Sequence, residues 1–131
     1  MREILFRGKR KDYGAWVEGY YVHNFWNDGE DTIHLVDGGC CTVMPETVCQ
    51  YTGLTDKNGR KIFENDFVSC RQYIGGNWVE YCIERGYVEM KHGAFGLHRI
   101  QGYYRPFKDW MEDYEYEVIG NIFDDPNLRN I

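Results

Sequence analysis

The chain has 131 residues, enough for one ordinary hydrophobic core and too few for two domains of typical size. Its formal net charge of −6 argues against a general affinity for nucleic-acid phosphates, which depends on clustered Lys and Arg. Fifteen Gly, eleven Tyr, seven Phe and four Trp favour a β-rich protein, because aromatic side chains suit a pleated surface and Gly supplies turns. We therefore expect one compact unit over residues 1–131, all-β and mainly antiparallel.

Nothing in the sequence is typical of a membrane segment or a secretion signal. No apolar run approaches the roughly 18 residues that cross a bilayer, so we expect a cytoplasmic protein without a membrane partner. An odd number of cysteines in a reducing compartment predicts free thiols rather than a disulfide framework. These cysteines are Cys40, Cys41, Cys49, Cys70 and Cys82.

Residues 1–49 predict a β-rich region that begins with a hairpin. Short apolar-rich runs flank the turn formers of residues 11–14, and further turn formers follow at residues 37–39. Proline cannot donate to a strand ladder, so Pro45 predicts an edge strand or a strand entry. We expect strands over 3–8, 15–22 and 32–36, a polar surface loop over 24–31, and the edge element over 42–48.

Residues 50–68 carry the strongest local pattern. The tetrad Asp56-Lys57-Asn58-Gly59 lies between the apolar residues Leu54 and Ile62. Asn-Gly readily takes the positive φ angles of tight hairpin turns, so this segment predicts a β-hairpin. A second turn is expected at 64–66, and a new strand at 67–70.

Turns recur at regular intervals in the rest of the chain, and short strands at this spacing favour a small barrel or sandwich. One short helix is expected over residues 106–114, because Pro106 suits a first helical turn and apolar residues follow at helical spacing. Those apolar residues are Phe107, Trp110, Met111 and Tyr114. The remaining strands are expected over 78–84, 87–91, 95–98 and 117–123.

No catalytic, cofactor-binding or metal-binding residues are predicted. The cysteines and histidines lack the paired spacing of structural zinc sites. The carboxylates between residues 112 and 125 are better explained as solvated surface. No glycine-rich loop has the sequence context of a phosphate cradle. We therefore expect a protein that is not an enzyme and uses no cofactor.

Basic residues at two turn tips suggest a nucleic-acid-binding surface, although this is not the favoured reading. Small β-barrels commonly bind single-stranded nucleic acid with aromatic side chains and basic loops. The two hairpin tips would have to lie on one side of the molecule. The negative net charge of the chain weighs against this alternative. Lys and Arg are also common at exposed turns simply because they favour solubility. The residues concerned are Lys9, Arg10, Lys11, Lys57, Arg60 and Lys61.

Three sequence blocks in chain order resemble the YopX family, small proteins of temperate phages and prophages. They are Arg7-Gly8-Lys9 with Trp16-Val17-Glu18-Gly19, then Pro45–Glu64, then Tyr116-Glu117-Val118-Ile119-Gly120-Asn121-Ile122. The family's Glu-Gly-Asp is here Glu64-Asn65-Asp66, and the turn is expected to survive because Asn tolerates positive φ. The resemblance implies an all-β architecture with an SH3-like barrel over residues 50–131, and it carries no established activity.

The aromatic side chains exceed what one small core holds comfortably, and Tyr and Trp are favoured at protein interfaces. Whether these side chains fill the core or an interface stays open at this point. The leading hypothesis is a non-enzymatic phage or prophage accessory protein that self-assembles or binds an unknown phage or host protein. The alternative is a small β-barrel that binds nucleic acid, and an uncharacterised enzyme ranks third.

Overall fold

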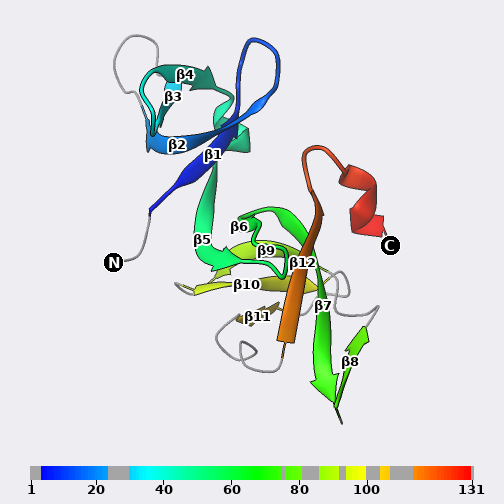
Figure 1. Cartoon of the computed structure of the whole chain (residues 1–131). Helices are drawn as coiled ribbons and strands as arrows, with labels where there is room; N and C mark the ends of the chain where they lie inside the picture. Colours follow the sequence, from blue (N-terminus) through cyan, green and yellow to red (C-terminus); the bar gives the residue numbers. More distant parts are fainter. Residues whose placement is uncertain are drawn as a thin grey trace. The chain divides into compact units, whose positions relative to one another are not determined.

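The computed structural model describes residues 4–23, 30–74, 76–80, 86–91, 94–99, 104–106 and 114–130. Over these residues the chain is all-β, with two antiparallel sheets, short 3-10 turns and no α-helix (Figure 1). The chain divides into two compact units, Met1–Gly53 and Leu54–Ile131. The border between them falls within strand β5 (Cys49–Thr55), four residues after the regional border at residues 49 and 50 that the sequence suggested.

The first sheet has the strand order β4-β3-β2-β1-β5-β6. Its register places Lys9 opposite Trp16 and Arg7 between Glu18 and Cys49. The 3-10 turn η2 (Pro45–Thr47) separates β4 from β5. The other strands are β1 (Phe6–Lys9), β2 (Trp16–Val22), β3 (Asp31–Leu35), β4 (Cys40–Val43) and β6 (Lys61–Phe63).

The second sheet has the order β11-β10-β9-β7-β12, and β8 also pairs with β7. Its strands are β7 (Asp66–Ile74), β8 (Asn77–Glu80), β9 (Gly86–Lys91), β10 (Ala94–Arg99), β11 (Tyr104–Pro106) and β12 (Tyr114–Asn121), followed by the 3-10 turn η5 (Pro126–Asn130). No pairing among the described strands closes either sheet, so the SH3-like barrel is not confirmed.

Most expected strands are present with shifted ends, and three differences are informative. Asp31 belongs to β3 rather than to the surface loop, and residues 24–29 of that loop lie outside the described part of the chain. Pro45 opens η2, beside the edge strand β4. The predicted helix over 106–114 has its described ends in strands, Pro106 in β11 and Tyr114 in β12, and residues 107–113 lie outside the described residues.

The first unit buries a small apolar centre around Ile33 and Val43. Gly19 on β2 is required there, because a Cβ atom at this position would lie 2.1 Å from the carbonyl oxygen of His34. Any side chain would push β2 away from β3. The close approach of these two strands therefore depends on glycine at position 19.

The second unit has its own hydrophobic core. It packs one face of the second sheet against residues of the β5–β6 hairpin, through Ile62, Val68, Cys70, Val88, Phe95, Leu97, Tyr116 and Val118, with Leu54 against them. Strand residues alternate between faces, so Phe67, Ser69 and Arg71 of β7 lie on the opposite side from Val68 and Cys70. A distinct core in each unit agrees with the division of the chain into two.

The turn of residues 56–59 closes around a buried carboxylate. Asp56, only 7% exposed, accepts hydrogen bonds at Oδ1 from the N–H groups of Asn58 and Arg60, both at 2.9 Å. Its Oδ2 accepts the N–H of Val118 on β12 at 3.0 Å. Burial raises the pKa of Asp56, but the N–H donors of Val118, Arg60 and Asn58 lower it, and the net pKa lies below the ordinary 3.8. The carboxylate is therefore held in its charged form.

The second predicted turn is confirmed as well. Asn65 has a φ of 67°, and Gly59 in the preceding turn has a φ of 80°. The Asn65 N–H donates to the carbonyl oxygen of Val88 at 2.8 Å, and its own carbonyl accepts the N–H of Ile122 at 3.0 Å. Both turns of the 50–68 segment thus hydrogen-bond to residues distant in the sequence.

Replacing Asp56 by Asn should lower the free energy of unfolding by roughly 1–3 kcal/mol at neutral pH, because the new NH₂ group would face a backbone N–H. The folded pKa of Asp56 is depressed, so its contribution is complete above the unfolded pKa and is lost as the pH falls through the folded pKa. Urea denaturation should therefore show the difference from wild type shrinking below about pH 4. Asp37→Asn, at an exposed turn, is the control and should have little effect; a difference for Asp56→Asn that is independent of pH would contradict this account.

Candidate functional site

A polar hollow of about 420 Å³ lies in the first unit. Small-molecule sites commonly enclose about 300–1,000 Å³, so the hollow is large enough to receive a ligand or a partner's side chains. It is lined by Arg10, Lys11, Asp12, Glu30, Cys40, Cys41 and Thr42. Two of these, Arg10 and Lys11, are among the cations that the sequence singled out.

Backbone pairing between the end of β1 and the edge strand β4 builds one wall of the hollow. The Lys11 N–H donates to the carbonyl oxygen of Thr42 at 2.9 Å, and the Met44 N–H donates to that of Lys9 at 2.9 Å. An isolated bridge joins Arg10 to Val43 between them. These bonds cover part of the outer edge of β4 and fix the basic tip beside Cys40 and Cys41.

Each cation of the hollow has an acidic partner. Arg10 donates to both carboxylate oxygens of Asp12, at 3.1 and 2.9 Å, and its guanidinium lies 4.3 Å from the centre of the Tyr13 ring. The hydrogen bond to Asp12 raises the pKa of Arg10, and the same bond lowers the pKa of Asp12. Lys11 Nζ donates to Glu30 at 3.3 Å. The two cations and two carboxylates balance, so the hollow offers no net attraction to a phosphate.

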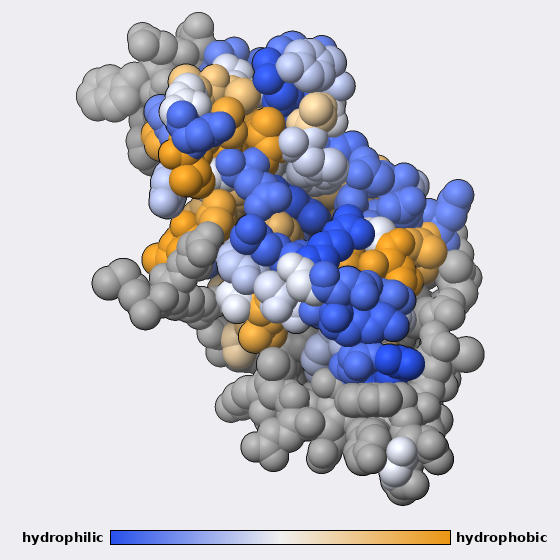
Figure 2. Space-filling view, in the orientation of Figure 1, coloured by the Kyte–Doolittle hydropathy of each residue, from blue (hydrophilic) through white to orange (hydrophobic). Residues whose placement is uncertain are grey.

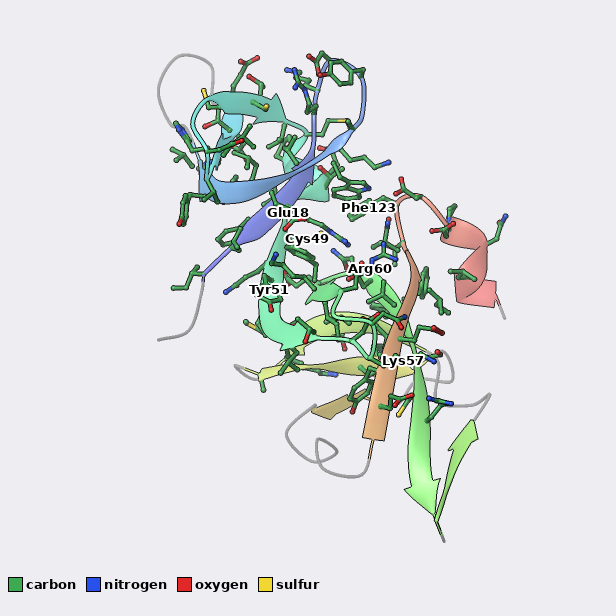
Figure 3. The ribbon with its side chains drawn as sticks, viewed as in Figure 1. Glu18, Cys49, Tyr51, Lys57, Arg60 and Phe123 are labelled. Carbon is green, nitrogen blue, oxygen red and sulfur yellow. The ribbon has the colours of Figure 1, made fainter. Side chains whose placement is uncertain are left out.

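Two of the other predicted cations also have an aromatic or acidic neighbour. Lys9 Nζ lies 5.4 Å from the centre of the Trp16 ring, a cation–π contact. Lys57, labelled in Figure 3, belongs to the second unit. Its Nζ lies 3.6 Å from Glu117 and 4.0 Å from Glu115. Arg60 and Lys61 are exposed next to it in sequence.

The structure thus gathers the six cations into two sets of three. Lys9, Arg10 and Lys11 follow one another at the end of β1. Lys57 and Arg60 lie in the β5–β6 turn of the second unit, and Lys61 begins β6. A common surface for the two sets stays a prediction. Pairing with Asp12, Glu30 and Glu117 reduces the positive charge that either set presents to a polyanion.

The sequence reasoning missed a buried acid in the first unit. Asp31, 2% exposed, accepts the hydroxyl of Tyr21 at 2.5 Å on Oδ2, and its Oδ1 lies 2.6 Å from His23 Nδ1. Burial and then the bond to Asp31 raise the pKa of Tyr21 to about 12. The available signal was the alternation of β3, which places Asp31 on the same face as Ile33.

Other ligand chemistry has little support among the described residues. No three His, Cys, Asp or Glu side chains in that part of the chain come together to hold a metal ion. Cys40, Cys41, Cys49 and Cys70 are free thiols, and Cys82 lies outside the described part. None of the described helical segments is long and apolar enough to cross a membrane.

Comparison with known proteins gives one family. The family model described as YopX protein matches residues 5–129 of the chain. No curated protein matches it. The matched range includes the hollow, the Asp31 cluster and both turns of the 50–68 segment.

Replacing Asp31 by Asn should bring the pKa of Tyr21 down from about 12 towards 10, because the neutral amide no longer disfavours the tyrosinate. A carbon-13 NMR titration of ring-labelled tyrosine would follow this group, with Tyr21→Phe to assign its signal. The folded pKa of Tyr21 is raised, so its contribution to stability is present below the unfolded pKa and is lost as the pH rises above about 10. An unchanged Tyr21 pKa in Asp31→Asn would show that the carboxylate has no part in the shift.

Proposed function

The chain belongs to the YopX family, and we propose that it is a phage accessory protein that acts without catalysis, through protein contacts, first of all with a second copy of itself. Membership in this family fits a phage-type protein and assigns no reaction. The free thiols of Cys40, Cys41, Cys49 and Cys70 suit the reducing cytoplasm, where we place it.

The observation that carries the proposal is an exposed patch of uncharged residues on one sheet face of the first unit. Tyr20 and Val22 alternate on one side of β2 and are 55% and 45% exposed. The register sets Tyr20 opposite His34 and Val22 opposite Thr32, and His34 in turn opposite Cys40. We call these five residues of β2, β3 and β4 the β2–β4 face.

The composition of the β2–β4 face suits association. Its five residues include no Lys, Arg, Asp or Glu, and the exposed Glu18, on the same side of β2 as Tyr20, marks its charged border. Tyr adds a large rigid surface at low entropic cost and is enriched where binding energy concentrates. Figure 2 shows hydrophobic residues reaching the surface of the first unit among hydrophilic ones.

A second copy is the preferred partner because one patch that meets its own copy across a two-fold axis needs no other complementary surface. In such an arrangement the Tyr20 side chains of both copies would lie near the axis. The aromatic surplus of the chain then has a physical use at an interface, in addition to the residues that fill its two cores.

Sedimentation velocity over a concentration series tests this proposal. The wild type should self-associate, and Tyr20→Lys should weaken the association at least about tenfold by placing a charge in the interface. Val36→Lys is the matched control, because Val36 is 70% exposed in the turn after β3 and lies outside the β2–β4 face. A wild type that stays monomeric throughout would contradict the proposal.

A separate assay addresses the nucleic-acid alternative. A salt-sensitive mobility shift of a single-stranded oligonucleotide, lost on changing Lys57, Arg60 and Lys61 to Glu, would favour that alternative over self-association. The acidic partners of Lys11, Arg10 and Lys57 argue against such a shift.

A further inference from the structure

Two adjacent cysteines line the polar hollow of the first unit, and self-association gives the hollow itself no role. Cys40 is exposed, whereas Cys41 is buried. The strand register sets Cys40 opposite His34 and Cys41 opposite the buried Ile33. Successive strand residues project to opposite faces, so the side chains of Cys40 and Cys41 diverge. This geometry disfavours a disulfide between them, and a disulfide at Cys40 therefore needs another sulfur.

Cys40 is also the one exposed thiol among the cysteines that the structure describes. Cys49 and Cys70 are 0% exposed, so a reagent in solution does not reach them in the folded state. The reactivity of a cysteine depends on this access and on cations that favour the thiolate, which is the nucleophile. Arg10 and Lys11 line the hollow together with Cys40. The accessible thiol and the cations therefore belong to one site.

The charges of the hollow have both signs and are available to a ligand. Arg10 donates to Asp12 through Nε and Nη2, and its guanidinium keeps N–H groups that these two bonds do not use. The side chains of Lys11 and Glu30 are 60% and 50% exposed, and an exposed pair of this kind holds together only weakly. The hollow therefore offers cations to the carboxylates of a ligand and carboxylates to its ammonium groups. A zwitterion fits such a site better than a polyanion does.

We propose that the hollow binds the disulfide form of a small zwitterionic thiol, and that Cys40 reacts with it to form a mixed disulfide. The Cys40 thiolate attacks one sulfur of the bound disulfide, the S–S bond breaks, and the other half leaves as a thiolate. Cys40 is oxidised, the leaving half is reduced, and the proton that Cys40 gave up ends on the leaving thiol. Because the side chain of Cys41 diverges from Cys40, the adduct remains until a thiol from solution reduces it.

This reaction and the proposed self-association share one residue. Cys40 belongs both to the hollow and to the β2–β4 face, so a charged adduct on it would also oppose association through that face. The reaction itself does not require association, and each proposal stands or falls separately.

Oxidised glutathione is a suitable probe, because it is a small disulfide that carries both carboxylate and ammonium groups. The test uses the full-length chain with Tyr20→Ser and Cys82→Ser, which removes the proposed contact between copies and the cysteine outside the described residues. Tandem mass spectrometry should place a single glutathione on Cys40 of the folded protein, and Cys40→Ser should prevent the reaction. An adduct on one of the buried cysteines instead, or no adduct after prolonged exposure, would overturn the proposal.

A second measurement separates recognition by the hollow from simple exposure of Cys40. The rate of reaction with oxidised glutathione is divided by the rate with hydroxyethyl disulfide, which is neutral. Lys11→Gln should lower this ratio at least about threefold, because it leaves the carboxylates of the hollow in excess. Lys91→Gln, at the exposed end of β9, removes the same charge elsewhere and should leave the ratio unchanged. An equal ratio in the starting protein and in Lys11→Gln would contradict the binding role of the hollow and overturn the proposal.

Discussion

The carboxylate of Asp56 connects parts of the second unit that lie far apart in the sequence. It joins the turn of residues 56–59 to β12, across 62 positions of the sequence. It also organises the turn itself, through the N–H groups of Asn58 and Arg60. Because a buried carboxylate is costly without donors, the turn and β12 have to come together for either arrangement to be stable. Local and long-range structure therefore form as one cooperative unit.

The turns of this protein were predictable because their causes are local. Asn-Gly and Asn-Asp favour particular backbone angles wherever they occur, and Gly59 and Asn65 adopt positive φ in the structure. Strands bounded by such turns were found with shifted ends. The helix predicted over residues 106–114 is wrong at the two ends that the structure describes, because Pro106 and Tyr114 belong to strands. A proline followed by apolar residues at helical spacing did not specify a helix at these positions. Pairing with β10 and β7 decided these ends, and a single sequence does not reveal such pairing.

The candidate site was only partly predictable for the same reason. Arg10 and Lys11 could be identified as a basic tip from sequence alone, but their carboxylate partners and the hollow they share depend on how β1 reaches β4. The partner of Lys11 is Glu30, 19 positions away. Asp31 was assigned to a loop because it ends a run of polar turn formers. The structure buries it in β3, where it accepts the Tyr21 hydroxyl and lies beside His23. The charged residues in a sequence therefore do not by themselves show the net charge of a surface, because some are paired and others are buried.

The most direct test of this account is the carboxyl pKa of Asp56, measured by carbon-13 NMR titration of the folded protein. The account predicts a pKa below the ordinary value of 3.8, because three backbone N–H groups stabilise the charged form more than burial opposes it. A pKa at or above 3.8 would mean that those donors do not hold the carboxylate, and would contradict the role assigned to it in joining the turn to β12.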